Sequence, residues 1–186
     1  SINDLPMPTG KQGWASFQDL IVSASKMAGV DPGLMATMAA IESNFRSGVK
    51  AASSSATGLY QFIDSTWKEM LNRYANKYGI SKNAKRTDPR ANALMGAEYI
   101  KENQRAIEEK ITGRDVTDTD LYAAHFLGAG GARSLLSSDP ATNASYVLPK
   151  AANSNPSIFK DKNGQDRTVT GVYNELKRRV KTRSDL

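Results

Sequence analysis

Hydrophobic residues recur at helical spacing along most of this chain. Between residues 17 and 45 they stand three, four and seven positions apart, the pattern that buries one stripe of an α-helix. The positions are Phe17, Leu20, Ile21, Ala24, Met27, Ala28, Leu34, Met35, Met38, Ile41 and Phe45. Gly29 should end the first of these helices. The second should begin with Asp31 as N-cap and Pro32 at its first helical position.

Capping and turn residues divide the rest of the chain into further helices. Asp64 should be the N-cap of a third helix that continues through Tyr78 and closes at Gly79. The remaining helices are expected from 88 to about 110, over 117–127 with an end at Gly128, over 130–138 and 140–148, and around Val172, Tyr173, Leu176 and Val180.

No segment shows the alternation of apolar and polar residues that predicts a β-strand. The stretch 149–168 is polar and holds the turn signals Asn155-Pro156 and Asn163-Gly164, so a small hairpin there is the most β-structure that we expect. The fold class is therefore predicted as mainly α. A length of 186 residues suits one domain over 1–186, which would bury roughly 70% of the surface of its unfolded chain.

Composition narrows the chemistry. The chain has no cysteine and one histidine, which excludes disulfides, thiolate zinc sites and a histidine cluster, so we expect no metal and no other cofactor. No run approaches eighteen apolar residues, and no membrane-spanning helix is expected. The start at Ser1 shows no basic and apolar signal segment, so export would have to be supplied in another way.

Positive charge gathers near the end of the chain. The formal net charge is +6, and the densest basic run is 174–183. Such a run is most often the solvated face of a terminal helix, and an anionic partner is the alternative. No nucleic-acid-binding module is recognisable, and the aromatic residues are not interleaved with basic ones. We therefore expect no nucleic-acid partner.

Glu42 is the strongest candidate for chemistry. It stands at the edge of the second apolar stripe, where apolar neighbours would remove water from its carboxyl group. Desolvation disfavours the anion and raises the pKa, so the acid keeps its proton near neutral pH and can act as a general acid. The alternative is an ordinary solvated glutamate near a helix end. The segment Gly58-Leu59-Tyr60-Gln61-Phe62, sixteen residues further on, favours the catalytic interpretation.

Two motifs in order carry a resemblance to a known family. Glu42-Ser43-Asn44-Phe45, the small-residue stretch 51–57 and the segment 58–62 resemble the soluble lytic transglycosylases, relatives of goose-type lysozyme. The family pattern is Glu-Ser, a polar loop and Gly-Leu-Met-Gln, and the resemblance runs from about Val30 to Tyr146. It implies a lysozyme-like helical domain that binds the glycan strands of bacterial peptidoglycan, an anionic partner, and cleaves the β-1,4 bond between N-acetylmuramic acid and N-acetylglucosamine.

The resemblance also implies a mechanism with one carboxylate. Glu42 would protonate the glycosidic oxygen and then, as a base, take the proton of the C6 hydroxyl of the same muramic acid, which leaves a 1,6-anhydro ring. A hydrolase of goose-lysozyme type would use water and a second acid. Asp64 is the obvious candidate for that acid, although we favour its interpretation as an N-cap. A wall-binding module without activity is the other alternative.

The second motif supplies candidates for substrate binding. Gly58 would let the backbone approach the sugar or adopt a positive φ, and the Gln61 amide can donate to and accept from an N-acetyl group or hydroxyl. Tyr60 stands where the family usually has methionine, and it would stack on a sugar ring or pack in the core. By resemblance Ser43 helps to hold the glutamate or the substrate; the alternative is a polar helix-end residue.

Later motifs add His125 and Tyr146. The family's Ala-Tyr-Asn-x-Gly corresponds to residues 124–128, where His125 replaces the tyrosine and Phe126 the asparagine. Phenylalanine cannot take over the hydrogen bond of asparagine to substrate, and His125 would face either the site or the core. A family Thr-x-x-Tyr-Val stretch matches 142–147 with one residue of slack, which implies that the Tyr146 hydroxyl reaches Glu42; ordinary helix packing is the alternative.

The departures from the family pattern suggest a biological setting. The His125-Phe126 pair and the missing signal segment resemble phage-borne members, such as an endolysin or a virion component with antimicrobial action. An effector delivered by a bacterial secretion machine is the alternative. In either case we expect a monomer, unless it is part of a larger protein, that acts on the cell wall from the periplasm.

Overall fold

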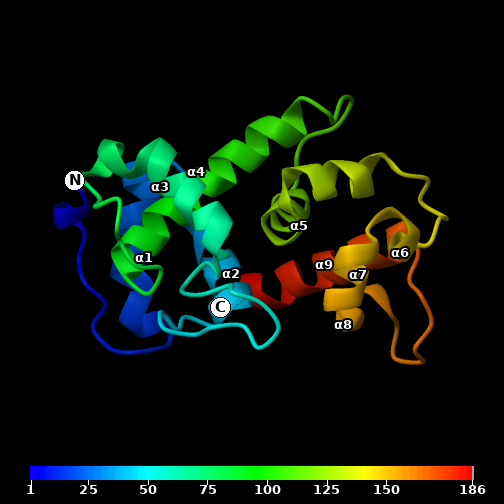
Figure 1. Ribbon diagram of the computed structural model, residues 1–186, viewed down its shortest axis with the longest axis horizontal. Coiled ribbons are helices and arrows are strands. Elements are labelled where there is room, and N and C mark those ends of the chain that lie inside the picture. Colours follow the sequence, from blue (N-terminus) through cyan, green and yellow to red (C-terminus); the bar gives the residue numbers. More distant parts are fainter. Residues whose placement is uncertain (186) are drawn as a thin grey trace. The chain divides into compact units, whose positions relative to one another are not determined.

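The computed structural model describes residues 1–185, and its regular structure is helical (Figure 1). The chain forms two compact units, Ser1–Lys101 and Glu102–Asp185, and each is described by itself. The predicted mainly α class is confirmed, because residues 1–185 contain isolated β-bridges but no named strand. The single domain over 1–186 stays a prediction.

The first unit contains the helices that carry Glu42 and the second motif. Its elements are η1 (Ile2–Asp4), α1 (Trp14–Ala28), α2 (Pro32–Ser43), α3 (Asp64–Tyr78) and the larger part of α4 (Pro89–Glu108), which continues into the second unit. Helices α1 and α2 pack against each other. The largest fully buried side chains of this unit are Phe17, Leu20, Ile21, Met35, Met38, Leu59, Tyr60, Met70, Leu94, Met95 and Ile100. The predicted apolar stripes therefore form its core.

Local capping sets most helix ends in this unit. Gly29 ends α1 in a left-handed conformation (φ 79°), as predicted. The Asp31 side chain accepts a hydrogen bond from the Leu34 backbone N–H at 2.9 Å, and Pro32 is the first residue of α2. Gly79 ends α3 with φ 68°.

The prediction that Asp64 is the N-cap of α3 is wrong. The N-cap is Ile63, and Asp64 is the first residue of the helix. The Asp64 backbone N–H donates to the Ser55 hydroxyl at 3.2 Å, so a residue from the preceding loop satisfies this free donor of the first turn. The Asp64 carboxylate is 57% exposed and pairs with Lys68 at 3.5 Å and Arg86 at 3.8 Å. Its negative charge at a helix N-terminus is stabilising there without being a cap.

A buried carboxylate links α4 to α3. Glu98 is 1% exposed, and its Oε1 accepts hydrogen bonds from Lys77 Nζ at 2.5 Å and the Tyr78 hydroxyl at 2.8 Å, with Lys101 Nζ at 3.5 Å. Burial alone would raise the pKa of Glu98, but the hydrogen bonds and the two lysine charges outweigh it and hold the pKa below its ordinary value.

The second unit contains the remaining helices. After the last turns of α4 come α5 (Asp118–Ser137), α6 (Ala144–Val147), α7 (Pro149–Ser154), α8 (Pro156–Phe159) and α9 (Val169–Ser184). Thr117 caps α5, and Asp120 returns the bond to the Thr117 backbone N–H. Gly128, where a helix end was predicted, has φ 77° and ψ 160°, and the ribbon of α5 changes direction within its length in Figure 1. The predicted helices on either side are thus two arms of one kinked element.

A buried carboxylate also ties this unit together. Asp120 is 0% exposed and accepts two hydrogen bonds from Arg114, at 2.7 and 3.1 Å, and one from the Tyr173 hydroxyl of α9 at 2.9 Å. Burial alone would raise the pKa of Asp120, but the Arg114, Thr117 and Tyr173 hydrogen bonds hold the pKa below its ordinary value. The bond joins the start of α5 to α9.

The hairpin expected within 149–168 forms only as a turn closed by one β-bridge, between Lys160 and Asp166. Residues 149–159 are mostly helical, because Pro149 and Pro156 each stand at the first position of a short helix. The Asn155-Pro156 pair that we predicted as a turn therefore starts a helix. Within residues 1–185, no helix has both the length and the apolar character needed to cross a membrane.

Candidate functional site

Glu42 lies in the last turn of α2. The helix buries Leu34, Met35, Met38, Ala39, Ala40 and Ser43, and Glu42 itself keeps part of its surface accessible. Desolvation raises the pKa of its carboxyl group to about 8, as its position at the edge of the apolar stripe predicts. At neutral pH this carboxyl group is protonated, so it can donate a proton to a bound molecule.

The chain makes a strained turn directly after this helix. Asn44 and Phe45 both have positive φ, 51° and 57°, although neither is glycine. Asparagine tolerates this conformation at a helix end, but for phenylalanine it is uncommon and costs of order 1–3 kcal/mol. Strain of this size persists only where the surrounding structure holds it.

The N-terminal segment holds the turn. The Trp14 and Phe45 rings contact each other with centroids 5.3 Å apart, and the Gly13 backbone N–H donates to the Phe45 carbonyl at 3.1 Å. From the other side Arg46 Nε donates to the Ser43 carbonyl at 3.1 Å. Phe45 is 3% exposed. We call these four residues, Gly13, Trp14, Phe45 and Arg46, the turn clamp.

Ser43 points back into its own helix. It is 2% exposed, and its hydroxyl donates to the Ala39 carbonyl at 3.1 Å. That bond is the usual one for a serine inside a helix. The alternative of a polar helix-end residue accounts for it in this structure, and its role toward Glu42 or a substrate stays a prediction.

Gly58 is required by the fold. Its φ is 90°, and a Cβ at this position would lie 2.4 Å from both the Arg86 carbonyl oxygen and Asn92 Nδ2. No other residue fits this contact. The predicted positive φ is present, and the close approach that the missing side chain allows is to the protein's own backbone.

Gln61 holds the loop with one end of its amide. Its φ is 53°, and Nε2 donates to the carbonyls of Val49 and Gly58, each at 3.0 Å. The amide oxygen accepts no hydrogen bond from residues 1–185. Of the two functions predicted for this amide, donation is used within the protein and acceptance is open to a ligand.

Tyr60 belongs to the core, so the interpretation as a sugar-stacking wall is wrong for this structure. The residue is 0% exposed, and its hydroxyl donates to the Met35 carbonyl of α2 at 2.8 Å. Burial raises the pKa of the Tyr60 hydroxyl. A ring without accessible surface cannot stack on a sugar, and this one instead fastens the second motif to the Glu42 helix.

Two residues that fix this loop were not predicted. Asn92 is 0% exposed; it accepts from the Tyr60 N–H at 2.8 Å and donates to the Arg86 carbonyl at 2.8 Å. Arg86 Nη1 donates to the carbonyls of Ser55 and Phe62, at 2.5 and 2.9 Å. Neither residue stands in a motif. The available signal was an asparagine between two alanines, on the face of α4 that also carries apolar residues.

His125 and Tyr146 belong to the second unit. His125 is buried, with 9% exposure, in the first arm of α5. Tyr146 on α6 is 80% exposed, so the side chain is not packed in the core. The predicted bond from Tyr146 to Glu42 stays a prediction. Phe126 contacts Tyr122, with ring centroids 6.2 Å apart.

Metal ligands do not gather in the described part of the chain. No group of three or more histidine, cysteine, aspartate or glutamate side chains within residues 1–185 is placed to hold an ion.

A known protein family matches the part of the chain that contains these residues. The family model described as the transglycosylase SLT domain matches residues 19–144, more than half of the chain. The match contains Glu42, the turn clamp residues Phe45 and Arg46, and the segment 58–62.

A solved structure supports the fold. The X-ray structure of an inactive mutant of lytic transglycosylase Slt from Pseudomonas aeruginosa is similar over 90% of this chain, with a TM-score of 0.51 and 17% sequence identity. The chain spans 26% of the length of that protein. At this identity the likeness concerns the fold, and it confirms the predicted lysozyme-like helical class. By the family match over residues 19–144, the chain belongs to the transglycosylase SLT domain family.

Proposed function

We propose that this chain cleaves the glycan strands of peptidoglycan as a lytic transglycosylase. The observation that carries the proposal is Glu42, a carboxyl group with a pKa of about 8 at the end of α2, within the part of the chain that matches the family. The similar Slt protein is described as inactive after one glutamate is replaced by glutamine. That description supports a glutamate as the group that matters.

The proposed reaction needs one acid and no water. Glu42 donates its proton to the oxygen between N-acetylmuramic acid and N-acetylglucosamine, and the bond from that oxygen to C1 of the muramic acid breaks. The O6 hydroxyl of the same muramic acid then bonds to C1 and gives its proton to the Glu42 carboxylate. The products are a free N-acetylglucosamine 4-hydroxyl end and a 1,6-anhydromuramoyl end, and the enzyme regains its proton.

The surroundings of Asp64 agree with a mechanism that uses a single acid. Its carboxylate is 57% exposed and pairs with Lys68 and Arg86, which is the environment of an ordinary surface carboxylate. A hydrolase of goose-lysozyme type with Asp64 as second acid is therefore the less favoured function, and a wall-binding module without activity would leave the raised pKa of Glu42 unused.

The supporting roles remain those of the sequence motifs. Gln61 would accept a hydrogen bond from an N-acetyl N–H or a hydroxyl through its amide oxygen, which the protein leaves open. Tyr146 would orient Glu42 or contact the sugar through its exposed hydroxyl. We keep His125, on α5, as a residue that would face the site.

Product analysis tests the proposal. Purified peptidoglycan is digested with the chain, and the muropeptides are separated and weighed by mass spectrometry. We expect anhydromuramoyl ends, each lighter by one water than a reducing end. Reducing ends would assign the chain to the hydrolases, and an undigested wall would leave only the binding module.

We also propose that the chain reaches the wall as a phage lysin or virion component, or as a secreted effector. The support is the resemblance of the His125-Phe126 pair to phage-borne members. Expression in a Gram-negative host with and without an added signal segment is the test. Lysis only when the signal is present would support action from the periplasm, and lysis without it would contradict a need for separate delivery.

A further inference from the structure

Arg46 is a cation close to the proposed acid, and the cleavage mechanism does not use it. The residue is exposed and stands four positions after Glu42. Its Nε donates to the carbonyl of Ser43 at 3.1 Å, and Ser43 directly follows Glu42, with consecutive Cα atoms about 3.8 Å apart. The guanidinium group is therefore anchored one residue from the acid.

The backbone of Arg46 is fixed as well. It forms an antiparallel β-bridge with Gln12. The residue before it, Phe45, is held by the Gly13 N–H and the Trp14 ring. A side chain that is anchored through both its backbone and its Nε loses little conformational freedom when it binds a ligand. Arg46 is thus preorganised for binding.

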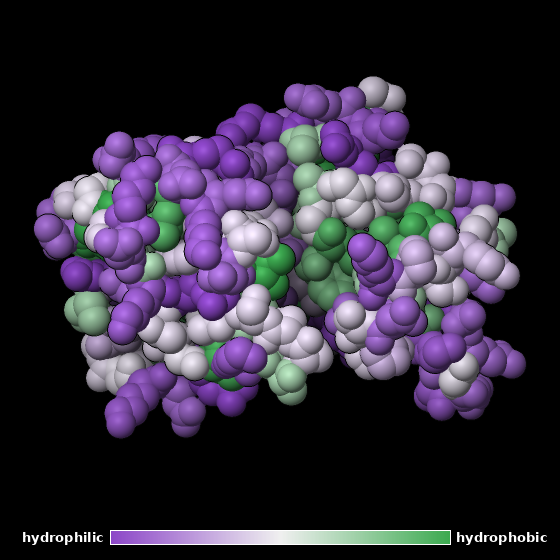
Figure 2. Space-filling model, viewed as in Figure 1, coloured by the Kyte–Doolittle hydropathy of each residue, from purple (hydrophilic) through white to green (hydrophobic). Residues whose placement is uncertain are grey.

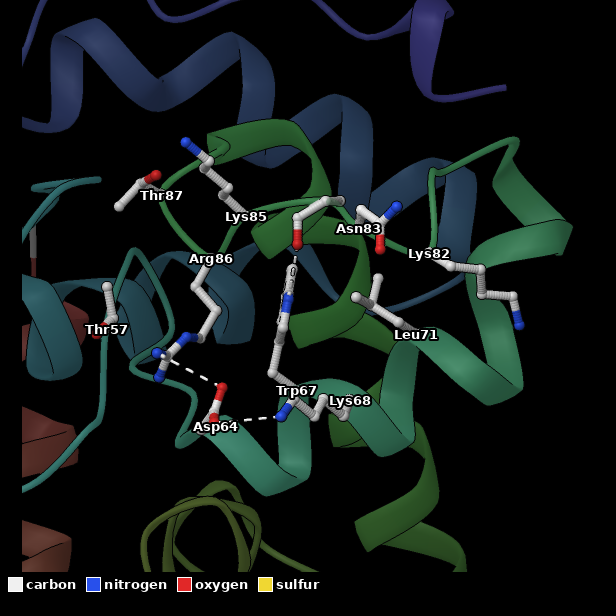
Figure 3. Close-up of a pocket in the computed structure, with 11 residues that line it drawn as sticks. Thr57, Asp64, Trp67, Lys68, Leu71, Lys82, Asn83, Lys85, Arg86 and Thr87 are labelled. Atoms are coloured by element: carbon white, nitrogen blue, oxygen red, sulfur yellow. Dashed lines mark hydrogen bonds and ion pairs between the residues drawn. The ribbon is translucent and has the colours of Figure 1, made fainter.

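Exposure does not distinguish Arg46, because in Figure 2 the surface over α3 and the start of α4, as Figure 1 locates them, is largely hydrophilic. Its open hydrogen-bond donors distinguish it. Nη1 and Nη2 of Arg46 form no hydrogen bond or ion pair with residues 1–185. The three other arginines of Ser1–Lys101 use their Nη groups within the protein: Arg73 pairs with Glu69 at 3.9 Å, Arg86 pairs with Asp64 at 3.8 Å in the pocket of Figure 3, and Arg90 donates to the Leu5 carbonyl at 3.5 Å.

The open donors fit a carboxylate. With Nε occupied, the two parallel N–H bonds on Nη1 and Nη2 remain, and such a pair matches the two oxygens of one carboxylate. Residues 1–185 supply no carboxylate to this fork. Glu42 itself is protonated at neutral pH, so it does not neutralise the charge. A carboxylate of a substrate bound at Glu42 is therefore the partner that Arg46 fits.

We propose that Arg46 binds the lactyl carboxylate of N-acetylmuramic acid and gives the chain a preference for glycan strands that carry no peptide. The inference rests on the proposed function for the identity of the polymer. The lactyl group is attached to O3 of the same sugar whose C1 bond is cleaved. It ends in a free carboxylate on bare strands and in a neutral amide where a peptide is attached, so a cation here distinguishes the two forms by charge.

Two substrates that differ only in this charge test the proposal. Strands are freed of peptide by an amidase, and part of the sample is converted to lactyl methylamides with methylamine and a carbodiimide. We expect the wild type to have a KM about fivefold lower for the carboxylate strands, and Arg46→Gln to have equal KM values for both. Arg46→Lys keeps the charge without the paired donors and should keep only part of the preference.

The matched control is Arg73→Gln, at an exposed arginine on α3, which should keep the wild-type preference. Circular dichroism and thermal midpoints show whether each variant is folded. A measurement on the wild type needs no variant: the preference should shrink as the salt concentration rises from about 0.05 M to about 0.5 M. A wild type without preference, a preference independent of salt, a preference that survives in Arg46→Gln, or its equal loss in Arg73→Gln would each overturn the proposal.

Binding separates this inference from the proposed function. If the wild type cleaves none of the strands, the proposed function fails, and calorimetric titration with the same two substrates still measures the preference. If the wild type cleaves them, the titration uses Glu42→Gln with and without Arg46→Gln. The Kd of the carboxylate strands should then be about fivefold lower only where Arg46 is present. Equal Kd values for both substrates in Glu42→Gln would refute the lactyl contact while leaving the proposed function intact.

Discussion

At the scale of single residues, the chemistry depends on how much water reaches one carboxyl group. Glu42 follows an apolar stripe, and burial of its carboxyl raises the pKa to about 8. Glu98 and Asp120 are more fully buried as residues, yet their pKa values are lowered, because each accepts several hydrogen bonds from cationic or hydroxyl groups. Burial alone therefore does not decide whether a carboxyl group keeps its proton. Its pKa depends on the balance between desolvation, which raises it, and hydrogen bonds to the carboxylate, which lower it.

Replacement of Glu42 tests the acid directly. Glu42→Gln keeps the shape of the side chain but cannot deliver a proton, so wall-lysis activity should fall by at least the roughly 10²–10⁴-fold attributed to general acid catalysis. Circular dichroism should be unchanged. A rate within tenfold of wild type in a folded variant would remove Glu42 from the mechanism.

The raised pKa of Glu42 also predicts how activity and stability change with pH. The proposed reaction uses the acid form of Glu42, so kcat/KM should fall as pH rises through about 8. For stability, the folded pKa lies above the unfolded value, so the contribution is fully present below the unfolded pKa near 4.5 and is lost as pH rises to about 8. The Tm difference between Glu42→Gln and wild type should therefore shift in favour of the variant between pH 5 and 8. Parallel melting curves at these two pH values check it, and a constant difference would contradict the raised pKa.

Tyr146 offers a test in which chemistry and stability separate. Its side chain is 80% exposed, so Tyr146→Phe should leave the Tm near that of wild type. If its hydroxyl orients Glu42 or the sugar, activity should fall by about one to two orders of magnitude. The measurement is the wall-lysis rate beside the thermal midpoint. An unchanged rate would withdraw Tyr146 from the site.

At the scale of elements, the turn after α2 is held by a segment from the start of the chain. Asn44 and Phe45 keep left-handed conformations because Gly13 and Trp14 bond and pack against Phe45. On the other side Tyr60 fastens the second motif to Met35 of α2. The helix that carries Glu42 is therefore held near its start by Tyr60 and just after its end by the N-terminal segment.

Loss of the Trp14 ring should release the turn clamp. Trp14→Ala should admit water near the end of α2 and lower the pKa of Glu42, so the alkaline limb of the pH–rate profile should move to lower pH and the rate at pH 7 should fall about tenfold. Trp14→Phe keeps a ring against Phe45 and should restore most of both. Rates are compared well below the Tm of each variant. A Trp14→Ala enzyme that is less stable but has the wild-type pH profile would limit Trp14 to a structural role.

At the scale of the whole molecule, each unit contains its own buried carboxylate network. Glu98 joins α3 and α4 in the first unit, and Asp120 joins α5 and α9 in the second. Both pKa values are lowered, so the stability that these groups contribute is present above their unfolded pKa values and is lost as pH falls through the folded ones. Acid should therefore weaken both units, in the opposite direction to the effect of Glu42.

The second unit provides a matched pair of variants for this point. Asp120→Asn leaves Arg114 without its buried partner and should destabilise the chain by about 3 kcal/mol. Asp166→Asn removes the exposed partner of Lys160 and should cost about 0–1 kcal/mol. Urea unfolding at pH 7 measures both. Similar losses for the two variants would show that burial of Asp120 adds nothing.

Much of the fold follows from the sequence because its signals are local. The apolar spacing, the left-handed glycines at 29 and 79 and the Asp31 cap act within about one helical turn, so they operate wherever the helix lies. The position of Glu42 at the edge of the apolar stripe is also a local feature, whereas the desolvation of its carboxyl group is a property of the folded chain. These features, together with the order of the two motifs, determined the fold class and the candidate acid.

Tertiary structure decided what depends on distant residues. Tyr60 is in the core because Asn92 and Met35 bond to it, and the first backbone N–H of α3 donates to Ser55 because the loop before the helix folds back. The strained turn after Glu42 is held by Trp14, and the hydrogen bond from Trp67 to Ala84 forms only because α3 and the segment after it meet. These contacts leave no periodic pattern or motif in the sequence, because they join residues that are far apart along the chain and are brought together only by packing. The sequence by itself therefore identified the candidate acid, and only the folded chain showed what holds its helix in place.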